Sequence, residues 1–599
     1  MRRLLILATL VLATPLAAMP EAAGDYFTRA KSALQRGDGI AAEADIAKAL
    51  DAGASRAEVA AAMGEAQLIQ SQLGKARTWL GTGEFAPETQ AHGWRMLGLL
   101  ERREGKLAAA AQAYDRAFSL TPDDPQLWVD IGRLRYVGGE HLPAIEAAAR
   151  ALSAAPDHPR ALEFQAELLR DGAGWAEALP LYERALAAAP DDLALLGGYA
   201  ATLGEAGRAR EMLSVTRKML AINPRHPAPW FLQAVLAARA GDTDLARSML
   251  GRAGSLAEIP AGLLLGGALE LEAGNANLAI GLLDRLVFVQ SANQRARHLL
   301  ARALLEAGEY DALLSRFGPL AARDDASPYL MTVLARAYEE RGDRIAAAGL
   351  LDRAGAAAPL PIAGIPQAAM RGDMAATWNA NPDSPGTTVA YVRSLLSTGN
   401  VGTADGAAGR FLELRPGSLD ALGLAGDLDL VQGRNGAAIE RYLLSAKVRF
   451  PDLLLLRLCE AYARAGRAGE GRALTARYLA AYPGSVLAAR LAADYSAHAS
   501  DWQHARALLE SVRVRGGNRD AQLLSDLAFA QLRAGDAKTA AATAERAWRL
   551  QPQSAIAAQA WALALVELDD NQELARQLLG QARALGGDNP LLAEARRKL

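Results

Sequence analysis

This chain of 599 residues has one cysteine, few aromatic residues and almost no net charge. A single cysteine excludes an internal disulfide framework and any CxxC metal pair. Lys and Arg number 65 and Asp and Glu 67, so the net charge of −2 argues against a general nucleic-acid binder. After the N-terminus no apolar run is long enough to span a bilayer, so no transmembrane segment is expected in the mature chain.

Hydrophobic residues are plentiful, at 51% of the chain, and much of this share is alanine. Because aromatic residues contribute only 6%, an alanine-rich interior favours closely packed helices over a β-sandwich. At this length a single compact core is improbable. The composition therefore predicts several domains or a repeat array.

Residues 1–18 have the layout of a secretory signal peptide. Arg2 and Arg3 precede an apolar run from Leu4 to Ala13, Pro15 breaks the helix, and cleavage is expected after Ala18. The sequence thus predicts export, to the periplasm. The alternative is an uncleaved segment that tethers the chain to the inner membrane.

Proline marks a period of 34 residues, because Pro122, Pro156, Pro190 and Pro224 follow one another at that spacing. Within the unit 91–124 we predict a first helix over 91–103, a turn at Gly105, and a second helix over 107–120. Proline at the end of each unit stops the second helix.

Small, aromatic and proline residues recur at equivalent places in each unit. Small residues at the crossing let the paired helices approach closely, and the aromatic residues fill the space around them. The positions that define this signature are Trp94, Gly98, Ala110, Tyr114, Ala117, Pro122, Trp128, Gly132, Ala144, Ala151, Pro156, Ala178, Tyr182, Ala185, Pro190 and Pro224.

This signature resembles that of the tetratricopeptide repeat (TPR) family. The resemblance implies an all-α protein, an α-solenoid of helix-turn-helix repeats wound into a right-handed superhelix, in one array or two. Weaker copies at 328–359, 419–451, 452–483 and 521–552 bring the total to about fifteen helix pairs. Cys459 falls in the small-residue position that Gly98 and Gly132 occupy, so we interpret it as a packing residue.

The repeat pattern also predicts the domain organisation. Residues 25–88 form degenerate helical repeats with turns near Gly37 and Gly74, residues 91–358 form a first TPR array, and residues 387–599 form a second. The segment 359–386 contains five prolines, which forbid a long helix pair. It is predicted to be either a hinge or a degenerate repeat.

Enzymatic motifs are missing from the sequence. It has no HExxH, no GxxxxGK[ST] and no GxSxG, and its seven histidines include no pair at the i, i+4 spacing of a zinc protease. His158 and His226 fall in loops, where an imidazole is usually solvated, and Asp124 and Asp192 are placed to cap helices. The segments 25–88 and 359–386 are too short for a hidden catalytic domain. We therefore expect no enzyme, no cofactor and no bound metal.

The resemblance implies that ligand contacts come from the first helices, which line the concave wall of such a solenoid. Arginine suits carboxylate or phosphate groups, although the same residues would also serve as solubilising charges. The corresponding positions here are His92, Arg95, Arg102, Arg133, Tyr136, Arg160, Glu163, Glu167, Phe231 and Arg239.

These observations favour a non-catalytic scaffold of the bacterial envelope that holds partner proteins or peptide segments in its concave groove. Exported TPR arrays resemble the repeat regions of polysaccharide export systems, so an accessory role in polysaccharide assembly or export is one expectation. The alternative is binding of a glycan or peptidoglycan polymer, which would use exposed aromatic rings. The sequence does not identify the partner.

Overall fold

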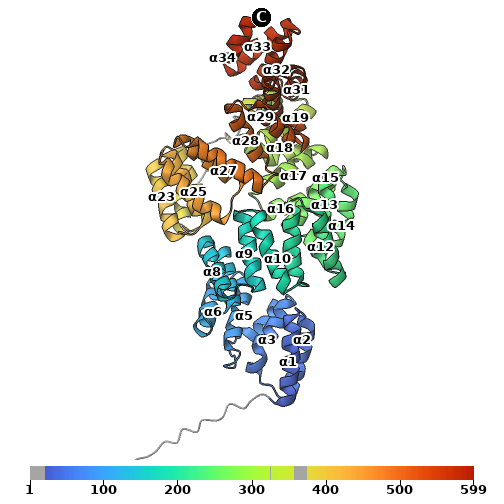
Figure 1. Ribbon diagram of the computed structural model, residues 1–599, viewed down its shortest axis with the longest axis vertical. Coiled ribbons are helices and arrows are strands. Elements are labelled where there is room, and N and C mark those ends of the chain that lie inside the picture. Colours follow the sequence, from blue (N-terminus) through green and yellow to red (C-terminus); the bar gives the residue numbers. More distant parts are fainter. Residues whose placement is uncertain (1–19, 324–325, 357–373) are drawn as a thin grey trace, which may run out of the picture. The chain divides into compact units, whose positions relative to one another are not determined.

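The computed structural model describes residues 20–323, 326–356 and 374–599 (Figure 1). Every regular element in these residues is a helix: they form 34 α-helices and two short 3-10 helices, and no strand. Through most of the chain, successive α-helices pack as pairs, and most pairs also contact the pair that follows. The predicted all-α solenoid is therefore confirmed.

The helices have the following bounds. Through residue 306 they are α1 (Glu21–Gln35), α2 (Gly39–Asp51), α3 (Arg56–Ile69), α4 (Leu73–Leu80), α5 (Gln90–Arg103), α6 (Leu107–Leu120), α7 (Pro125–Val137), α8 (His141–Ala154), α9 (Pro159–Gly172), α10 (Trp175–Ala188), α11 (Leu193–Glu205), α12 (Ala209–Ile222), α13 (Pro227–Arg239), α14 (Thr243–Arg252), η1 (Gly254–Ala257), α15 (Pro260–Glu272), α16 (Ala276–Val289) and α17 (Gln294–Glu306). Thereafter they are α18 (Tyr310–Ala321), α19 (Pro328–Glu340), α20 (Arg344–Ala356), α21 (Met374–Ala380), α22 (Pro385–Ser397), α23 (Val401–Leu414), α24 (Leu419–Val431), α25 (Asn435–Val448), α26 (Asp452–Arg464), α27 (Ala468–Ala481), α28 (Val486–His498), α29 (Trp502–Val514), η2 (Gly517–Arg519), α30 (Ala521–Arg533), α31 (Ala537–Leu550), α32 (Ala555–Leu568), α33 (Gln572–Gly586) and α34 (Pro590–Lys598).

The turn inside each helix pair contains a residue with positive φ. Gly105 has φ +78°, as predicted, and the backbone repeats this conformation at intervals of 33 to 35 residues through much of the chain. Ser71, Ser500 and Asp569 occupy the equivalent place in three pairs, with φ of 59°, 60° and 51°. These turns fix the repeat register independently of the prolines.

The expected turn near Gly37 is present, with φ +72°, but the one near Gly74 is wrong. The second pair turns at Ser71, and Gly74 lies inside α4. Its backbone is helical there and nothing lies within 4 Å of the place a side chain would take. The prediction took glycine as the turn residue, but in this pair Ser71, three residues earlier, adopts the left-handed conformation.

Side chains at the repeat junctions cap the helices. The carboxylates of Asp124 and Asp192 accept backbone N–H groups at the starts of α7 and α11, as expected. His158 and His226 are not simply solvated, because each Nδ1 accepts a backbone N–H from the following helix, at 3.3 Å in both cases. Burial lowers the pKa of both imidazoles, so they stay neutral and able to accept.

Gly98 packs against the second helix of its own pair, as the sequence predicts, whereas the nearest neighbour of Gly132 is Phe164, on the first helix of the next pair. A Cβ on Gly98 would lie 2.4 Å from Cε1 of Tyr114, and one on Gly132 would lie 2.5 Å from Cε1 of Phe164. The alanines of the second-helix stripe are fully buried. Cys459 is also buried, with Sγ 3.2 Å from the Thr475 hydroxyl, and burial raises the pKa of its thiol. Its packing role is thus supported.

The repeat tryptophans are partly exposed, and each has an arginine over its ring. The guanidinium carbon of Arg116 lies 4.4 Å from the centroid of Trp94, and that of Arg150 lies 4.9 Å from Trp128. Arg252 lies over Trp230 in the same way, at 4.9 Å. One face of each ring is therefore covered by a cation from the second helix of its own pair.

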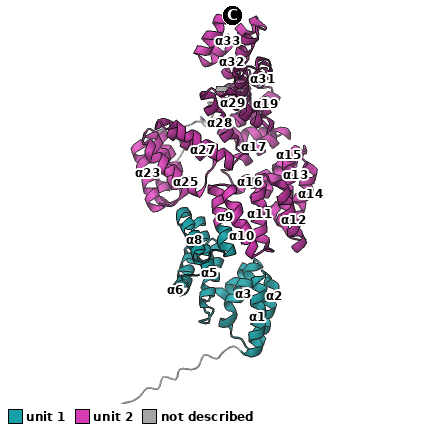
Figure 2. Cartoon of the chain, in the orientation of Figure 1, with its two compact units in different colours: residues 1–164 teal, residues 165–599 magenta. Residues whose placement is uncertain are grey.

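The chain divides into two compact units, residues 1–164 and 165–599 (Figure 2). The predicted signal segment 1–18 and residues 359–373 of the proline-rich segment lie outside the described residues. The rest of that segment contains α21 and the first two residues of α22, Pro385 and Gly386. Whether a hinge separates two arrays there stays a prediction. Among the described residues, no helix is both long enough and apolar enough to cross a membrane.

Candidate functional site

The first helices of the unit 1–164 place a row of charged side chains on one face. His92 on α5 contacts Glu65 on α3, with 2.9 Å between Nε2 and Oε2, and its Nδ1 lies 3.3 Å from Nη2 of Arg95. Arg95 in turn pairs with Asp130 on α7, with 3.3 Å between Nη1 and Oδ2. Three successive first helices are thus joined by one chain of polar contacts, which we call the polar ladder (Glu65, His92, Arg95 and Asp130).

A second group of charges extends this face onto the start of α9. Arg160 donates to Oε2 of Glu163 at 2.9 Å, and Nη2 of Arg133 on α7 lies 3.8 Å from the same oxygen. Glu163 therefore joins two arginines that come from neighbouring repeats.

The carboxylates of this face are more buried than the arginines that cover them. The side chains of Asp130 and Glu163 are 8% and 9% exposed, whereas those of Arg95, Arg133 and Arg160 are 16%, 29% and 37% exposed. Although the pairs nearly cancel in charge, guanidinium groups thus form more of the surface than carboxylates do. We call Arg95, Arg102, Arg133 and Arg160 the arginine wall.

Three arginines of the wall act electrostatically on Asp130. Burial raises the pKa of this carboxyl, and the positive charges of Arg95, Arg102 and Arg133 oppose that rise. Gln126 also donates to Oδ1 of Asp130, at 3.4 Å. Asp130 therefore pairs directly with Arg95 and supplies a buried negative charge close to Arg102 and Arg133.

The other predicted contact residues make different contacts. Tyr136 packs its ring edge-on against His141, with 5.0 Å between centroids. Glu167, Phe231 and Arg239 belong to the other unit, 165–599. Phe231 packs against the cluster around Ala234, and Arg239 donates to the carbonyl of Gly204 at 2.7 Å. Within the unit 1–164 the structure thus brings together His92, Arg95, Arg102, Arg133 and Arg160, with Glu163.

Arg239 belongs to a repeated structural contact. The equivalent Arg103 donates to the carbonyl of Leu68 at 2.6 Å, and Arg464 donates to that of Leu430 at 3.2 Å. In each case the acceptor lies near the C-terminal end of the preceding first helix, where carbonyls lack a helical partner. These arginines join neighbouring repeats, a role their place in the sequence alone does not reveal.

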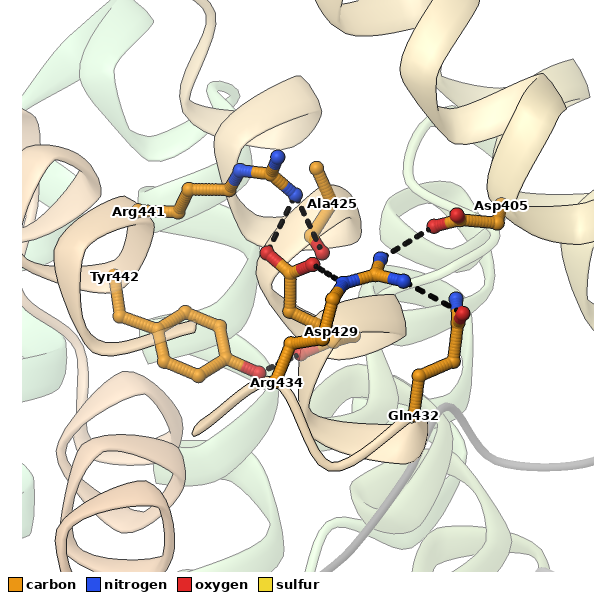
Figure 3. A network of polar contacts seen from close by, with 8 residues as sticks. Asp405, Ala425, Asp429, Gln432, Arg434, Arg441 and Tyr442 are labelled. Carbon is orange, nitrogen blue, oxygen red and sulfur yellow. Dashed lines mark hydrogen bonds and ion pairs between the residues drawn. The ribbon is translucent and has the colours of Figure 1, made fainter. Parts of the chain in front are cut away.

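A second polar network, not predicted from the sequence, lies in the unit 165–599 (Figure 3). The side chain of Asp429 on α24 is only 1% exposed and pairs with two arginines, Arg434 at 2.6 Å and Arg441 at 2.5 Å. Arg434 also reaches Asp405 on α23, at 2.8 Å. The network ties three consecutive helices together and is neutral in sum, which suits a structural role.

Asp429 has equivalents in other repeats. The family signature places tyrosine seven residues after its first tryptophan, and this chain has Glu101, Glu270 and Asp429 at that position. Glu101 pairs with Arg77 at 2.6 Å and Glu270 with Arg247 at 2.9 Å. An acidic residue in place of the signature tyrosine is the signal that could have predicted these pairs.

No metal site emerges from the geometry. In residues 20–323, 326–356 and 374–599, no three His, Cys, Asp or Glu side chains are grouped so that they could hold an ion.

Comparison with known proteins gives a family and a set of distant folds. A model of the tetratricopeptide repeat matches residues 91–134, whereas no curated protein sequence matches the chain. The crystal structure of the APC/C hetero-tetramer Cut9–Hcn1 is 12% identical, with a TM-score of 0.40 and 97% of each chain covered. The type IV pilus biogenesis factor PilW is 19% identical, with a TM-score of 0.30, over 35% of this chain and 98% of its own.

A third similar structure is the human IFIT1 dimer with m7Gppp-AAAA, at 15% identity and a TM-score of 0.35, over 71% of this chain and 99% of that one. The matched segment 91–134 spans the predicted unit 91–124 and most of the first helix of the next unit. Together with the helix pairs, the glycine turns and the small-residue packing, this match supports a tetratricopeptide-type repeat fold.

Proposed function

We propose that the protein is a non-catalytic scaffold of the bacterial envelope that binds partner proteins or peptide segments along its first helices. The proposal rests on the side chains that α3, α5, α7 and the start of α9 place on one face. These side chains are charged, pre-positioned by ion pairs and contributed by successive repeats. In stacked helix pairs the first helices form the inner wall, so an elongated partner would meet these side chains in order.

Export rests on the sequence of residues 1–18 alone. If it is correct, the chain recovered from envelope fractions begins at Met19, and N-terminal mass spectrometry measures this directly. A chain that keeps Met1 and sediments with the inner membrane would support the tethered alternative. A role in polysaccharide assembly or export would then be tested by polymer secretion in a deletion strain.

The glycan alternative receives less support. Glycan binding needs open aromatic faces, and Trp94, Trp128 and Trp230 each have one face covered by an arginine. Tryptophan fluorescence on addition of soluble glycans tests it, and a flat response disfavours it.

Site-specific crosslinking tests the scaffold function. A photo-reactive phenylalanine derivative in place of Tyr136, on the first-helix face, should capture a reproducible envelope partner in living cells. The matched control carries the same group in place of Arg217, which is exposed on the second helix α12. Equal capture from both positions, or none from position 136, would count against a binding face on the first helices.

A further inference from the structure

The carbonyl groups at the end of α9 accept hydrogen bonds from residues far along the chain, all within the unit 165–599. The backbone N–H of Phe450 donates to the carbonyl of Asp171 at 3.1 Å. The hydroxyl of Tyr482 lies 3.3 Å from the carbonyl oxygen of Arg170 and 3.5 Å from that of Gly172, and donates to this pair. The last carbonyls of a helix have no partner within it, so residues from distant repeats satisfy three of them here.

The two segments also approach each other closely. A Cβ on Gly172 would lie 2.6 Å from the carbonyl oxygen of Lys447, and one on Gly174 would lie 3.2 Å from the Cβ of Ala481. The first of these distances is too short for any side chain. Glycine therefore lets the end of α9 meet the backbone at the end of α25.

The turn between α9 and α10 departs from the repeat register at this contact. Its positive-φ residue, Gly174, falls 35 residues after Gly139 and 33 before Gly207, one residue late. Helix α9 is 14 residues long, whereas the first helices α7 and α11 have 13. The residue that ends the longer helix is Gly172, which lies against Lys447.

The opposite side of the contact departs from the repeat as well. The junction between α25 and α26 has three residues, 449–451, whereas the junctions after α6 and α27 have four. Its N-cap residue is Pro451, which has no N–H, in the place where Ser485 caps α28. The N–H of Phe450 donates across the contact to Asp171 and not within the junction. Two irregular places of the repeat thus meet each other.

Aromatic packing holds the two donors in place. The ring of Tyr482 lies 4.7 Å from that of Tyr478, which in turn packs edge-on against Phe450 at 4.8 Å between centroids. Burial and the negative charges of Asp171 and Glu205 raise the pKa of Tyr482 to about 12. Its hydroxyl therefore keeps the proton that it donates.

We propose that these residues form an intramolecular clasp (Arg170, Asp171, Gly172, Phe450 and Tyr482) that locks the two predicted arrays together and gives the scaffold a closed and an open state. In the closed state the chain between the two segments forms a loop, and both arrays face a partner at a fixed distance. Opening the clasp frees them to move apart. This inference goes beyond the proposed function and does not depend on it.

Disulfide trapping in the full chain is the first test. Gly174→Cys with Ala481→Cys places two Cβ atoms 3.2 Å apart, close to the shortest separations in disulfides, about 3.5 Å. Cys459→Ala removes the native thiol, so only the introduced cysteines can pair. After mild oxidation we expect most monomers isolated by size exclusion to contain the intramolecular disulfide, read by peptide mass spectrometry.

The matched control combines Gly207→Cys with Ala481→Cys in the same background. Gly207 is the turn glycine of the following helix pair, with φ +74°, and nothing lies within 4 Å of its Cβ position. This pair shares the backbone strain and should not form the disulfide. Equal trapping in both pairs, or none at 174 and 481, would overturn the clasp. A disulfide formed only between two chains would also overturn it and assign the contact to paired copies.

Hydrogen exchange tests the clasp without added cysteines. The N–H of Phe450 donates to Asp171 across the contact, so its exchange rate reports whether the clasp is closed. Gly172→Ala puts a methyl group 2.6 Å from the carbonyl oxygen of Lys447 and should raise this rate about tenfold, although alanine favours α9 itself. Gly281→Ala in α16 is the control, because its Cβ position is open.

Tyr482→Phe removes only the hydroxyl and keeps the ring. It should raise the exchange rate of Phe450 about threefold, with an unchanged circular dichroism spectrum. If Gly172→Ala unfolds, Tyr482→Phe decides alone. A Phe450 rate that is the same in the wild type and in every folded variant would refute the clasp.

Discussion

At the scale of single residues, glycine sets how closely the helices of a pair approach. Gly98→Leu should lower the free energy of unfolding by about 1–3 kcal/mol or more, because a Cβ there would overlap Tyr114, 2.4 Å away. Hydrogen exchange over residues 90–120 measures the loss locally. Gly24→Ala in α1 is the control, since nothing lies within 4 Å of its Cβ position and alanine favours the helix. Wild-type exchange in Gly98→Leu would mean that the assigned register is off by a position.

A second residue-scale prediction concerns Asp526 on α30. Burial raises its pKa to about 6 from an ordinary value of 3.8, against the opposing charge of Arg490 at 3.3 Å. Between these values the folded chain holds a proton that the unfolded chain has released. Protonated Asp526 therefore contributes its full stabilisation of the fold below about pH 4, and this stabilisation is lost as the pH rises through 6.

Asp526→Asn should therefore raise the free energy of unfolding at pH 7.5 by about 1 kcal/mol and change little near pH 4. This value is well below the free energy that corresponds to the whole pKa shift of Asp526, because the side chain is 38% exposed and solvent screens its charge. Thermal unfolding at the two pH values measures the difference. An equal effect at both values would show that the substitution acts through packing and not through ionisation.

At the scale of the helix pair, the turn residue sets the register. Ser500 holds φ +60°, a conformation that costs a non-glycine residue about 1–2 kcal/mol and glycine very little. Ser500→Gly should stabilise the pair α28–α29 by part of that amount, and hydrogen exchange of these helices should slow. Gly105→Ala is the converse test, because φ is +78° there and no clash interferes. No change in either variant would mean that these turns relax at no cost.

The same turns explain how much of the fold the sequence predicts. Proline and glycine act on their own backbone, so their spacing predicted the pair α5–α6 to within one residue of its observed bounds. Gly74 failed because the residue that needs a positive φ can also be serine, as at Ser71. Local signals of this kind carry no information about partners further along the chain.

The candidate site was predictable only in part, because local sequence signals do not show which side chains of different helices meet. The repeat register placed His92, Arg95, Arg133 and Arg160 on one face, and in the structure His92 contacts Arg95 while Arg133 and Arg160 both contact Glu163. Arg239 also lies on a first helix but donates to a backbone carbonyl instead. Which partner an arginine takes depends on distances between helices about 34 residues apart, and no spacing in the sequence gives these distances.

At the scale of the whole molecule, the proline-rich segment 359–386 allows a test of the predicted division into arrays. If it is a hinge, limited proteolysis of the native chain should cut there first, because a protease needs several residues of extended backbone. Mass spectrometry of the earliest fragments locates the cut. Early cuts spread evenly through 91–260 would contradict the hinge and favour a continuous solenoid.

Helices that pack mainly on their neighbours along the chain also make each pair a removable module. Residues 193–226 form one such module of 34 residues, and excising them would join Asp192 directly to Pro227. That junction already exists in this protein, where Asp124 caps a helix that begins at Pro125. A gene that gained or lost such a block would still encode a properly capped helix at the seam, so the length of the array is free to evolve while its parts stay the same.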